Sequence, residues 1–174
     1  MTPESIVDSI DTDCCIVGGG PAGAVLALLE RPDQQRRLSD DPRLAQSAIE
    51  ELLRFVSPVE VATERYARED LEIAGTRVRR GELVLGVLGS ANHDEQQFVN
   101  PDVLDLTREH NPHLAFGQGA HYCLGSPLAR LEGQIAITTL LRRCPNLRLS
   151  VPSAALRWRR GLFLHGLVEL PIAV

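Results

Sequence analysis

Three glycines surround a single cysteine in the stretch from Phe116 to Arg130, which reads FGQGAHYCLGSPLAR. The glycines stand at 117, 119 and 125, around Cys123. Glycine adopts backbone conformations that are closed to other residues, and it allows the backbone to approach a flat ligand closely. This spacing predicts a tight, irregular loop that presents the sulfur of Cys123 to a ligand. The alternative is that Cys123 binds no ligand and is a small residue buried in a glycine turn.

A helix is predicted directly after this cysteine. Ser126 is placed to cap it, and Pro127 suits its first position. Unpaired amides and the positive end of the helix dipole would favour the thiolate of Cys123 over the thiol. Such a thiolate can act as a metal ligand, a nucleophile or a redox centre. His121 would share a face with Cys123 in an extended segment and could act as its base, although no known hydrolase signature surrounds the pair.

Composition limits the classes of protein to which the chain can belong. The 174 residues are 44% hydrophobic and 24% charged, which is typical of one soluble globular domain. A net charge of -5 argues against general nucleic-acid binding. The N-terminus is acidic, and the longest apolar run, 14–29, is interrupted at Gly18 to Pro21, so neither a secretory signal nor a membrane span is expected. We expect a cytoplasmic protein with no membrane partner. The other cysteines, at 14, 15 and 144, show no CxxC spacing and are interpreted as packing residues.

The periodicity of apolar residues predicts a mainly α fold with a small antiparallel β part. A short strand at 14–17 should lead into a glycine turn, with helices from Ala22 to Leu29, over the polar stretch that follows, and up to Val56. Residues 59–88 should form short strands joined at Gly75 and Gly81. Residues 89–115 are rich in loop formers, a helix should follow from Ser126, and the tail from Leu147 resembles hairpin strands.

The cysteine stretch closely resembles the ligand loop of cytochromes P-450, the haem-thiolate monooxygenases, because it fits FGxGxHxCxGxxLAR without a mismatch. The resemblance implies that Cys123 is the axial thiolate ligand of the haem iron, whose electron donation favours O–O cleavage. It also implies that Phe116 packs against the haem beside the sulfur and that His121 hydrogen-bonds a haem propionate. Gly117, Gly119 and Gly125 belong to the same cofactor-binding loop.

Further motifs extend this resemblance over 25–174. "EELLR" contains Glu51 and Arg54, three residues apart on one helical face. Such a pair is ordinarily an exposed ion pair worth a few tenths of a kcal/mol. The resemblance implies instead a buried structural pair that supports the cysteine loop. Arg65 falls where the family places an arginine that binds a propionate. The fold implied is an incomplete cytochrome P-450, its proximal half only.

The sequence departs from the family at two places. Val103 stands where the family usually carries an arginine, in the segment called the meander that leads into the cysteine loop. Glu51 is therefore expected to lack one partner, and Arg108 is not expected to replace it. The central helix of the family carries a glycine–acid–threonine kink that relays protons to dioxygen, whereas 18–24 holds no acid and no hydroxyl. The upstream substrate-access elements and the distal wall are also absent from the sequence.

The run IVGGGPAG resembles the FAD-binding start of flavin monooxygenases, with Gly18, Gly20 and Gly23 in the G-x-G-x-x-G spacing. A dinucleotide site also needs a second parallel strand that ends in an acid about 20 residues further on. Asp40 and Asp41 lie at about that distance, but no strand precedes them. We therefore interpret 1–24 as a vestigial FAD-like unit that precedes the haem-binding part, 25–174.

The resemblance thus implies an oxidoreductase fragment that binds haem and, by family, hydroxylates a small organic molecule with O2. No residue is assigned a certain catalytic role. Electrons would come from a ferredoxin and its reductase, and arginines at 77, 79, 80, 142 and 143 could form the docking face or a solvated surface. Two alternatives stay open: a non-catalytic truncated or fused remnant that lacks the distal pocket, and an FAD-binding oxidoreductase module.

Overall fold

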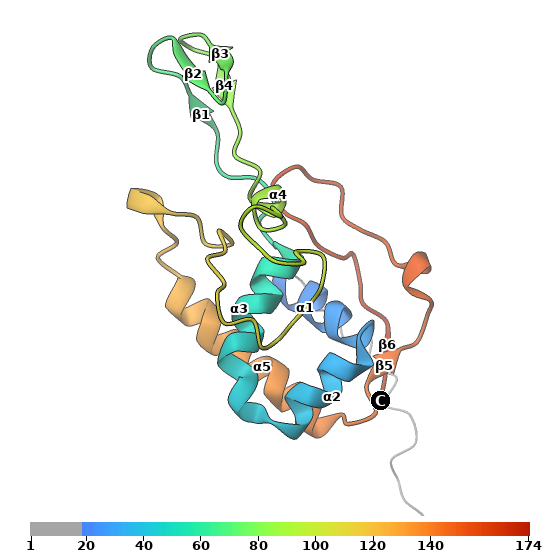
Figure 1. Cartoon of the computed structure of the whole chain (residues 1–174). Coiled ribbons are helices and arrows are strands. Elements are labelled where there is room, and N and C mark those ends of the chain that lie inside the picture. The colour runs from blue at the N-terminus through green and yellow to red at the C-terminus, as the bar shows by residue number, and fades with distance from the viewer. Residues whose placement is uncertain (1–18) are drawn as a thin grey trace, which may run out of the picture.

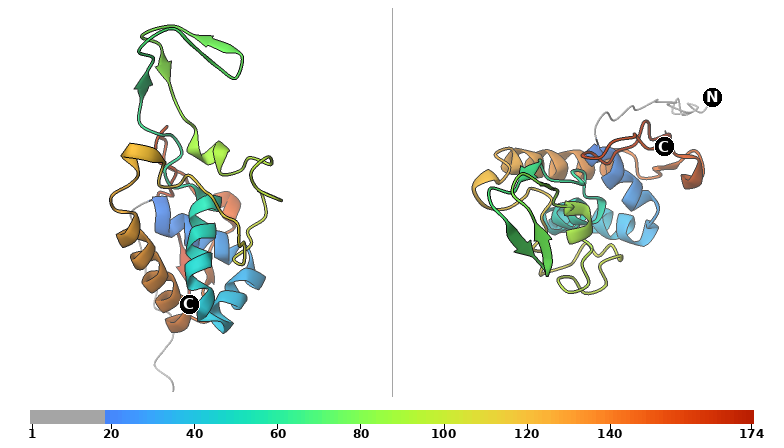
Figure 2. Two further views of the ribbon diagram at one scale, coloured as in Figure 1. Left: turned by 60° about the vertical axis from the view of Figure 1, so that its left-hand side comes forward. Right: turned by 90° about the horizontal axis from the view of Figure 1, so that it is seen from above.

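The computed structural model describes residues 19–174, in which a group of helices carries a protruding β arm (Figures 1 and 2). The strand predicted at 14–17, together with Cys14, Cys15 and Gly18, lies outside the described residues. The helices are α1 (Gly19–Leu29), α2 (Pro32–Asp40), α3 (Ala45–Val56), α4 (Leu88–Ala91) and α5 (Ser126–Arg143), with short 3-10 turns η1 (Pro42–Leu44), η2 (Gly119–His121) and η3 (Ser153–Ala155). The mainly α prediction is confirmed.

The strands form three antiparallel pairs. Their bounds are β1 (Arg65–Tyr66), β2 (Leu71–Ile73), β3 (Thr76–Val78), β4 (Leu83–Val84), β5 (Arg148–Leu149) and β6 (Ile172–Ala173). β1 pairs with β4 and β2 with β3, which builds the arm, while β5 pairs with β6 in the tail. Gly75 and Gly81 have φ of 80° and 87°, so both predicted junctions use the left-handed freedom of glycine. No parallel pair occurs among residues 19–174.

The principal core lies between α1, α2, α3 and α5. Buried apolar side chains from these helices meet two leucines of the long loop before the cysteine stretch, Leu104 and Leu106. A second cluster joins α1 to the tail through Leu147, Leu167 and Leu170. Cys144 packs at its edge, as predicted for a packing residue. Within residues 19–174, no helix is both long and apolar enough to cross a bilayer.

Helix α3 carries the side chains that support the cysteine loop. Its apolar face packs against α1 and α5. The helix ends at Val56, and the next residue, Ser57, adopts a left-handed conformation with φ of 44°. The hydroxyl of Ser57 donates to the carbonyl of Arg54 at 2.8 Å and so satisfies one terminal carbonyl. Ser57 and Pro58 therefore terminate the helix, as the sequence predicts.

Gly23 allows α1 to pack closely on α3. A Cβ at Gly23 would lie 2.5 Å from Cγ1 of Val56, which is closer than carbon atoms approach without a shift. We expect Gly23→Ala to lower the free energy of unfolding by about 1–2 kcal/mol, because overpacking outweighs the helix propensity gained. Urea unfolding followed by circular dichroism measures this change.

Gly20→Ala is the matched control in the same helix. A Cβ there would meet Pro58 at 3.6 Å, an ordinary contact, so this variant should be as stable as the parent or slightly more so. Equal stability of the two variants would contradict the close approach at Gly23.

Candidate haem-thiolate site

The cysteine loop closes on itself through backbone hydrogen bonds. The amide of Cys123 donates to the carbonyl of Phe116 at 3.0 Å, and the amide of Ser126 donates to the carbonyl of Cys123 at 3.2 Å. Gly117 and Gly119 have φ of 72° and 79°, a region that strongly favours glycine. Cys123 is exposed, so the alternative of a small buried cysteine is wrong.

Cys123 lines a cavity of about 770 Å3, within the ~300–1,000 Å3 typical of small-molecule and cofactor sites. Its walls are mainly apolar and come from the end of α3, the arm and the cysteine loop. Phe116, Gly117, His121 and Arg65 line the same cavity, so the structure brings these predicted residues together. The guanidinium of Arg65 donates to Oγ1 of Thr63 at 2.6 Å, beside its own strand.

Two local predictions about this loop are wrong. Ser126 does not cap α5, because it is already the first helical residue and is buried; Gly125 occupies the cap position without a side-chain bond. His121 belongs to the 3-10 turn η2 and not to an extended segment, so the geometry assumed for a His121–Cys123 nucleophile pair is absent. A Cβ at Gly125 would lie 3.8 Å from the sulfur of Cys123.

Glu51 and Arg54 form an ion pair whose side chains are both 0% exposed. Nε and Nη2 of Arg54 each donate to one carboxylate oxygen of Glu51 at 2.8 Å. The other guanidinium protons reach three carbonyls of the loop after α4: those of Asn92 and Pro101 at 2.8 Å, and that of Val103 at 3.2 Å. A buried guanidinium is tolerated only when all of its N–H donors have acceptors, and all five donors of Arg54 have one here.

Arg108 completes the network around Glu51, which corrects the expectation that Glu51 lacks a partner. Nε of Arg108 donates to Oε2 of Glu51 at 3.0 Å. The amide of Asp105 and the side chain of Asn111 add bonds of 3.0 and 3.1 Å. Val103 contributes its carbonyl, which no side chain at that position would alter. The arginine therefore comes from five residues further along the chain than the pattern places it.

Asn92 is a buried residue that the sequence patterns did not single out. Its Nδ2 donates to the hydroxyl of Ser57 at 2.9 Å, and its Oδ1 accepts from the amide of Leu114 at 2.7 Å. It therefore joins the end of α3 to the segment that enters the cysteine loop. Its place in a polar, loop-forming stretch gave no signal, because a buried asparagine and a solvated one look alike in a sequence.

A second polar cluster, which we call the Glu50 cluster, consists of Glu50, His113, Tyr122 and Arg130 around the ring of Phe116. Arg130 donates to both oxygens of Glu50 at 2.6 and 2.9 Å, and to the hydroxyl of Tyr122 at 3.0 Å. Nε2 of His113 lies 2.9 Å from Glu50. Burial opposes ionisation of Glu50, but hydrogen bonds to His113 and Arg130 outweigh it and lower its pKa to about 2.

Because the pKa of Glu50 is lowered in the fold, the stability of the protein should decrease in the acidic pH range. The pKa of Glu50 is about 4.5 without these partners and about 2 in the fold. Its contribution to stability is therefore complete above pH 4.5 and is lost as the pH falls towards 2. We expect Glu50→Gln to be roughly 2 kcal/mol less stable than the parent at pH 6, and this gap to shrink to about a quarter of that at pH 2.5. Urea unfolding at both pH values measures the difference. A gap that is unchanged by pH would contradict the assignment.

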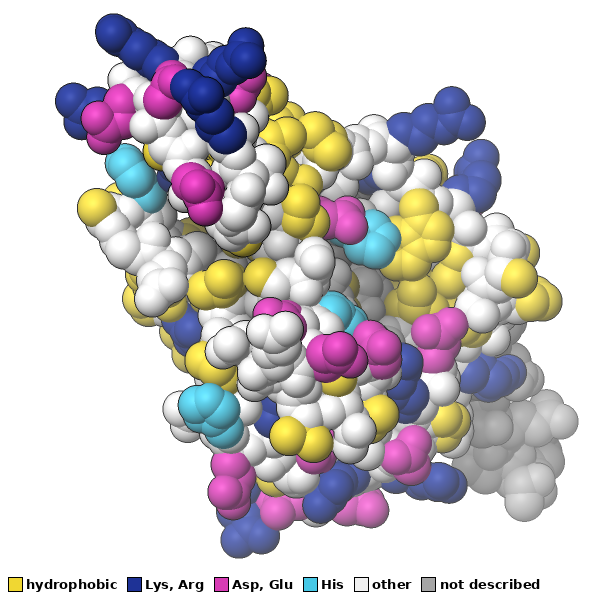
Figure 3. Space-filling model, turned by 45° about the horizontal axis from the view of Figure 1, so that its top comes forward, with side chains coloured by type: hydrophobic (Ala, Val, Ile, Leu, Met, Phe, Trp, Pro, Cys, Tyr) yellow, Lys and Arg dark blue, Asp and Glu magenta, His cyan; other side chains and the backbone are white. Residues whose placement is uncertain are grey.

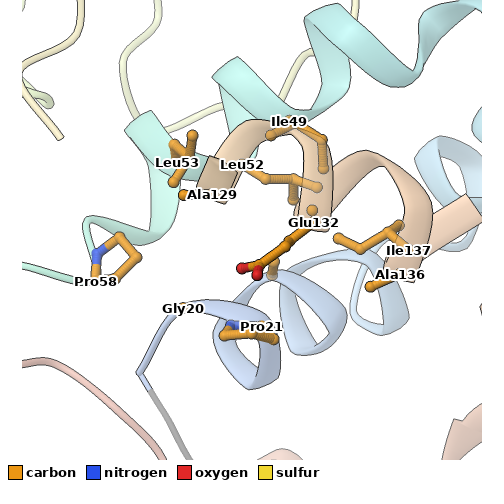
Figure 4. Close-up of a pocket in the computed structure, with 12 residues that line it drawn as sticks. Gly20, Pro21, Ile49, Leu52, Leu53, Pro58, Ala129, Glu132, Ala136 and Ile137 are labelled. Atoms are coloured by element: carbon orange, nitrogen blue, oxygen red, sulfur yellow. The ribbon is translucent and has the colours of Figure 1, made fainter. Parts of the chain in front are cut away.

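A smaller cavity of about 250 Å3 lies between α1, α3 and α5. Figure 4 shows its apolar lining, with the carboxylate of Glu132 directed into it between α5 and α1. Gly20, Leu53, Pro58 and Ala129 line both this cavity and the one that contains Cys123. The two cavities are therefore neighbours that share these residues as a common wall.

Comparison with known proteins decides the family. The model of the Cytochrome P450 family matches residues 29–152, which include the Glu51–Arg54 pair and the whole cysteine loop. The chain belongs to the cytochrome P450 family. It is 53% identical over 153 residues to nocardicin C N-oxygenase of Nocardia uniformis subsp. tsuyamanensis, a match over 87% of this chain and 38% of that protein. It is 40% identical over 169 residues to the polyketide biosynthesis cytochrome P450 PksS of Bacillus subtilis, over 97% of this chain and 41% of that protein.

Solved cytochrome P450 structures share the fold. The tirandamycin C-bound P450 monooxygenase TamI superposes with a TM-score of 0.87 and 43% identity, over 88% of this chain and 39% of that chain. P450BioI, in complex with an acyl carrier protein bearing hexadec-9-enoic acid, gives a TM-score of 0.83 and 48% identity, over 88% of this chain and 39% of that chain. The chain thus spans about two fifths of the length of these relatives.

The flavin alternative has no support in these comparisons. The P450 match covers the chain from residue 29, and the family is a haem-thiolate family. Gly20 and Gly23 lie inside α1, Gly18 lies outside the described residues, and residues 19–174 contain no parallel strand to carry Asp40 and Asp41. The boundary between 1–24 and 25–174 stays a prediction; α1 continues across it.

The five arginines considered as a docking face do not lie together in this cytochrome P450. Arg77, Arg79 and Arg80 are exposed on the arm, where Figure 3 shows basic side chains interleaved with acidic ones. Arg77 is paired with Asp70 at 2.7 Å. Arg142 and Arg143 lie in the last turn of α5, at the opposite end of the molecule (Figure 1). The arm and α5 therefore cannot supply one common basic face.

Proposed function

We propose that this chain provides the haem-thiolate half of a cytochrome P450 monooxygenase, with Cys123 as the iron ligand. The observation that carries the proposal is the exposed sulfur of Cys123 on the wall of the 770 Å3 cavity, directly before α5. Arg65 and His121 are proposed to bind the haem propionates, and Phe116 to pack beside the sulfur. Gly117, Gly119 and Gly125 keep the loop narrow around the ligand.

The residues present fit a haem. A flat, largely apolar macrocycle needs apolar walls, and Leu53, Val59 and Leu88 line the cavity beside the loop. Its two carboxylates need donors, which Arg65 and His121 carry on the same cavity. The iron needs a soft axial ligand, for which a thiolate is suited. The chemistry of the site therefore matches the cofactor of the family.

When bound, haem supplies the redox chemistry of dioxygen, and an axial thiolate favours cleavage of the O–O bond. The work of this chain's own residues is to keep that thiolate in place. The amide-to-carbonyl bond between Cys123 and Phe116 fixes the backbone beside the sulfur. Helix α5 begins three residues after Cys123, and the positive end of a helix dipole favours a negative charge beside it. Helix α1, with the sequence GGPAGAVLALL, carries no acidic or hydroxyl side chain, so it relays no proton itself.

The proposed reaction transfers one oxygen atom of O2 to a small organic molecule, while the second leaves as water with two electrons and two protons. Electrons would come from a ferredoxin and its reductase, and the site of action would be the cytoplasm. The names of two relatives support the transfer of oxygen: one is an N-oxygenase and another, from Micromonospora griseorubida, is a mycinamicin IV hydroxylase/epoxidase.

Absorption titration of the purified chain with haem tests the cofactor assignment. The proposal predicts saturable binding with one haem per chain and a spectrum unlike that of free haem. A spectrum that remains that of free haem at every ratio of haem to chain, or a yellow fluorescent preparation that carries flavin, would overturn it. Oxygen-dependent turnover with ferredoxin, its reductase and NADPH then separates an active enzyme from a non-catalytic remnant, which would bind haem without product.

A further inference from the structure

The ring of Phe116 is held by the guanidinium of Arg130. The carbon Cζ of Arg130 lies 4.6 Å from the ring centroid, in the range of a cation–π contact. The ring of Tyr122 makes an edge-on contact with that of Phe116, with the two centroids 6.3 Å apart. The carbonyl of Phe116 accepts the amide of Cys123 at 3.0 Å. Movement of Phe116 would therefore move the backbone of the proposed ligand.

Arg130 is itself anchored on α3. It makes two parallel bonds to the carboxylate of Glu50, at 2.6 and 2.9 Å, which is the fork geometry that arginine alone offers. The side chain of Glu50 is 25% exposed, and His113 holds its second oxygen. The contact between Glu50 and Arg130 thus links α3 to α5 across the start of the cysteine loop.

This support differs from the Glu51–Arg54 network. Glu51 and Arg54 bind carbonyls and side chains of residues 92–111, which precede the loop. Glu50 and Arg130 act within the loop, on Phe116 and Tyr122. Adjacent carboxylates on α3 therefore reach two different segments.

We propose that Glu50 and Arg130 are positioning residues for the Cys123 thiolate, acting through the ring and carbonyl of Phe116. The effect expected at the haem rests on the proposed function, whereas the contacts among Glu50, Arg130 and Phe116 do not depend on it. Lysine at 130 would keep the charge and lose both the fork and the flat stacking on Phe116. The geometry of the loop should therefore be sensitive to Arg130→Lys as well as to Arg130→Gln.

Amide hydrogen exchange of the full-length, haem-free chain tests the positioning directly. The amide of Cys123 should exchange at least about tenfold faster in Arg130→Gln and Glu50→Gln, because its acceptor is no longer held. Arg130→Lys should give an intermediate rate. Arg143→Gln, an exposed arginine in the same helix with the same change of charge, should leave the rate unchanged. The amide of Ile137, a buried core residue in the middle of α5, reports global opening in the same sample.

Equal acceleration at Cys123 and Ile137 would overturn the proposal, because it would mark only lower global stability. An unchanged Cys123 rate would overturn it as well. The double variant Glu50→Gln/Arg130→Gln should be little worse than either single one, whereas additive effects would contradict joint action. In the haem-loaded protein, the same variants should lower the fraction with thiolate-type absorption. If haem failed to bind to the parent protein, the proposed function would be wrong. The exchange rates would still show whether Glu50 and Arg130 position the cysteine loop.

Discussion

Replacing Arg54 by glutamine should lower the free energy of unfolding by about 3–5 kcal/mol, the cost of leaving one partner of a buried ion pair unpaired. Both side chains are 0% exposed, so water cannot replace the lost bonds to Glu51. The carbonyls of Asn92 and Pro101 would lose their donor at the same time. A domain of this size is stable by only about 5–15 kcal/mol, so the loss is a large share of the total.

Arg108→Gln is the matched control for this prediction. Arg108 also bonds Glu51, but its side chain is 11% exposed, and Glu51 keeps Arg54, Asn111 and the amide of Asp105. We expect a loss of about 1–2 kcal/mol. Urea unfolding at pH 7 measures both. If the Arg54 variant were no less stable than the Arg108 variant, the buried pair would not be the centre of this network.

Cys123→Ser should abolish thiolate ligation, the largest functional effect that a single atom can produce here. A serine hydroxyl is a poor soft ligand, so the reduced, carbon-monoxide-bound absorption spectrum should lose the band characteristic of thiolate-bound haem completely. Cys144→Ser provides the control, because Cys144 lies at the other end of α5 and packs in the apolar cluster beside the tail. It should retain the band at full intensity.

A Cys123→Ser protein that keeps the band would assign the ligand to another sulfur and overturn the site. Loss of the band in both variants would point to general damage and not to ligation. Circular dichroism of the three proteins, recorded beside the absorption spectra, reports whether each is folded.

Local patterns predicted much of the fold. The apolar spacing in α3, the Ser57–Pro58 stop and the turns at Gly75 and Gly81 depend on residues a few positions apart, so the sequence displays them directly. Phe116, Gly117, His121 and Cys123 of the cysteine motif line one cavity, whereas Gly119 and Gly125 are not among the residues that line it. Ser126 was misjudged because the chain enters α5 through Gly125, and whether a hydroxyl caps a helix depends on backbone angles that composition does not specify.

The supporting contacts were harder to predict because they join distant segments. Arg108 is 57 positions from Glu51, and Arg130 is 80 from Glu50. Asn92 bridges Ser57 and Leu114 only once the loop after α4 has folded back on α3. Such side chains look like ordinary surface residues in a sequence, and only their burial reveals the network.

X-ray absorption at the iron edge of the haem-loaded chain identifies the atom bound to the metal and so tests whether Cys123 is the ligand. We expect one sulfur neighbour of iron in the parent and in Cys144→Ser, and none in Cys123→Ser. Iron surrounded only by nitrogen and oxygen in the parent protein would rule out Cys123 as the ligand.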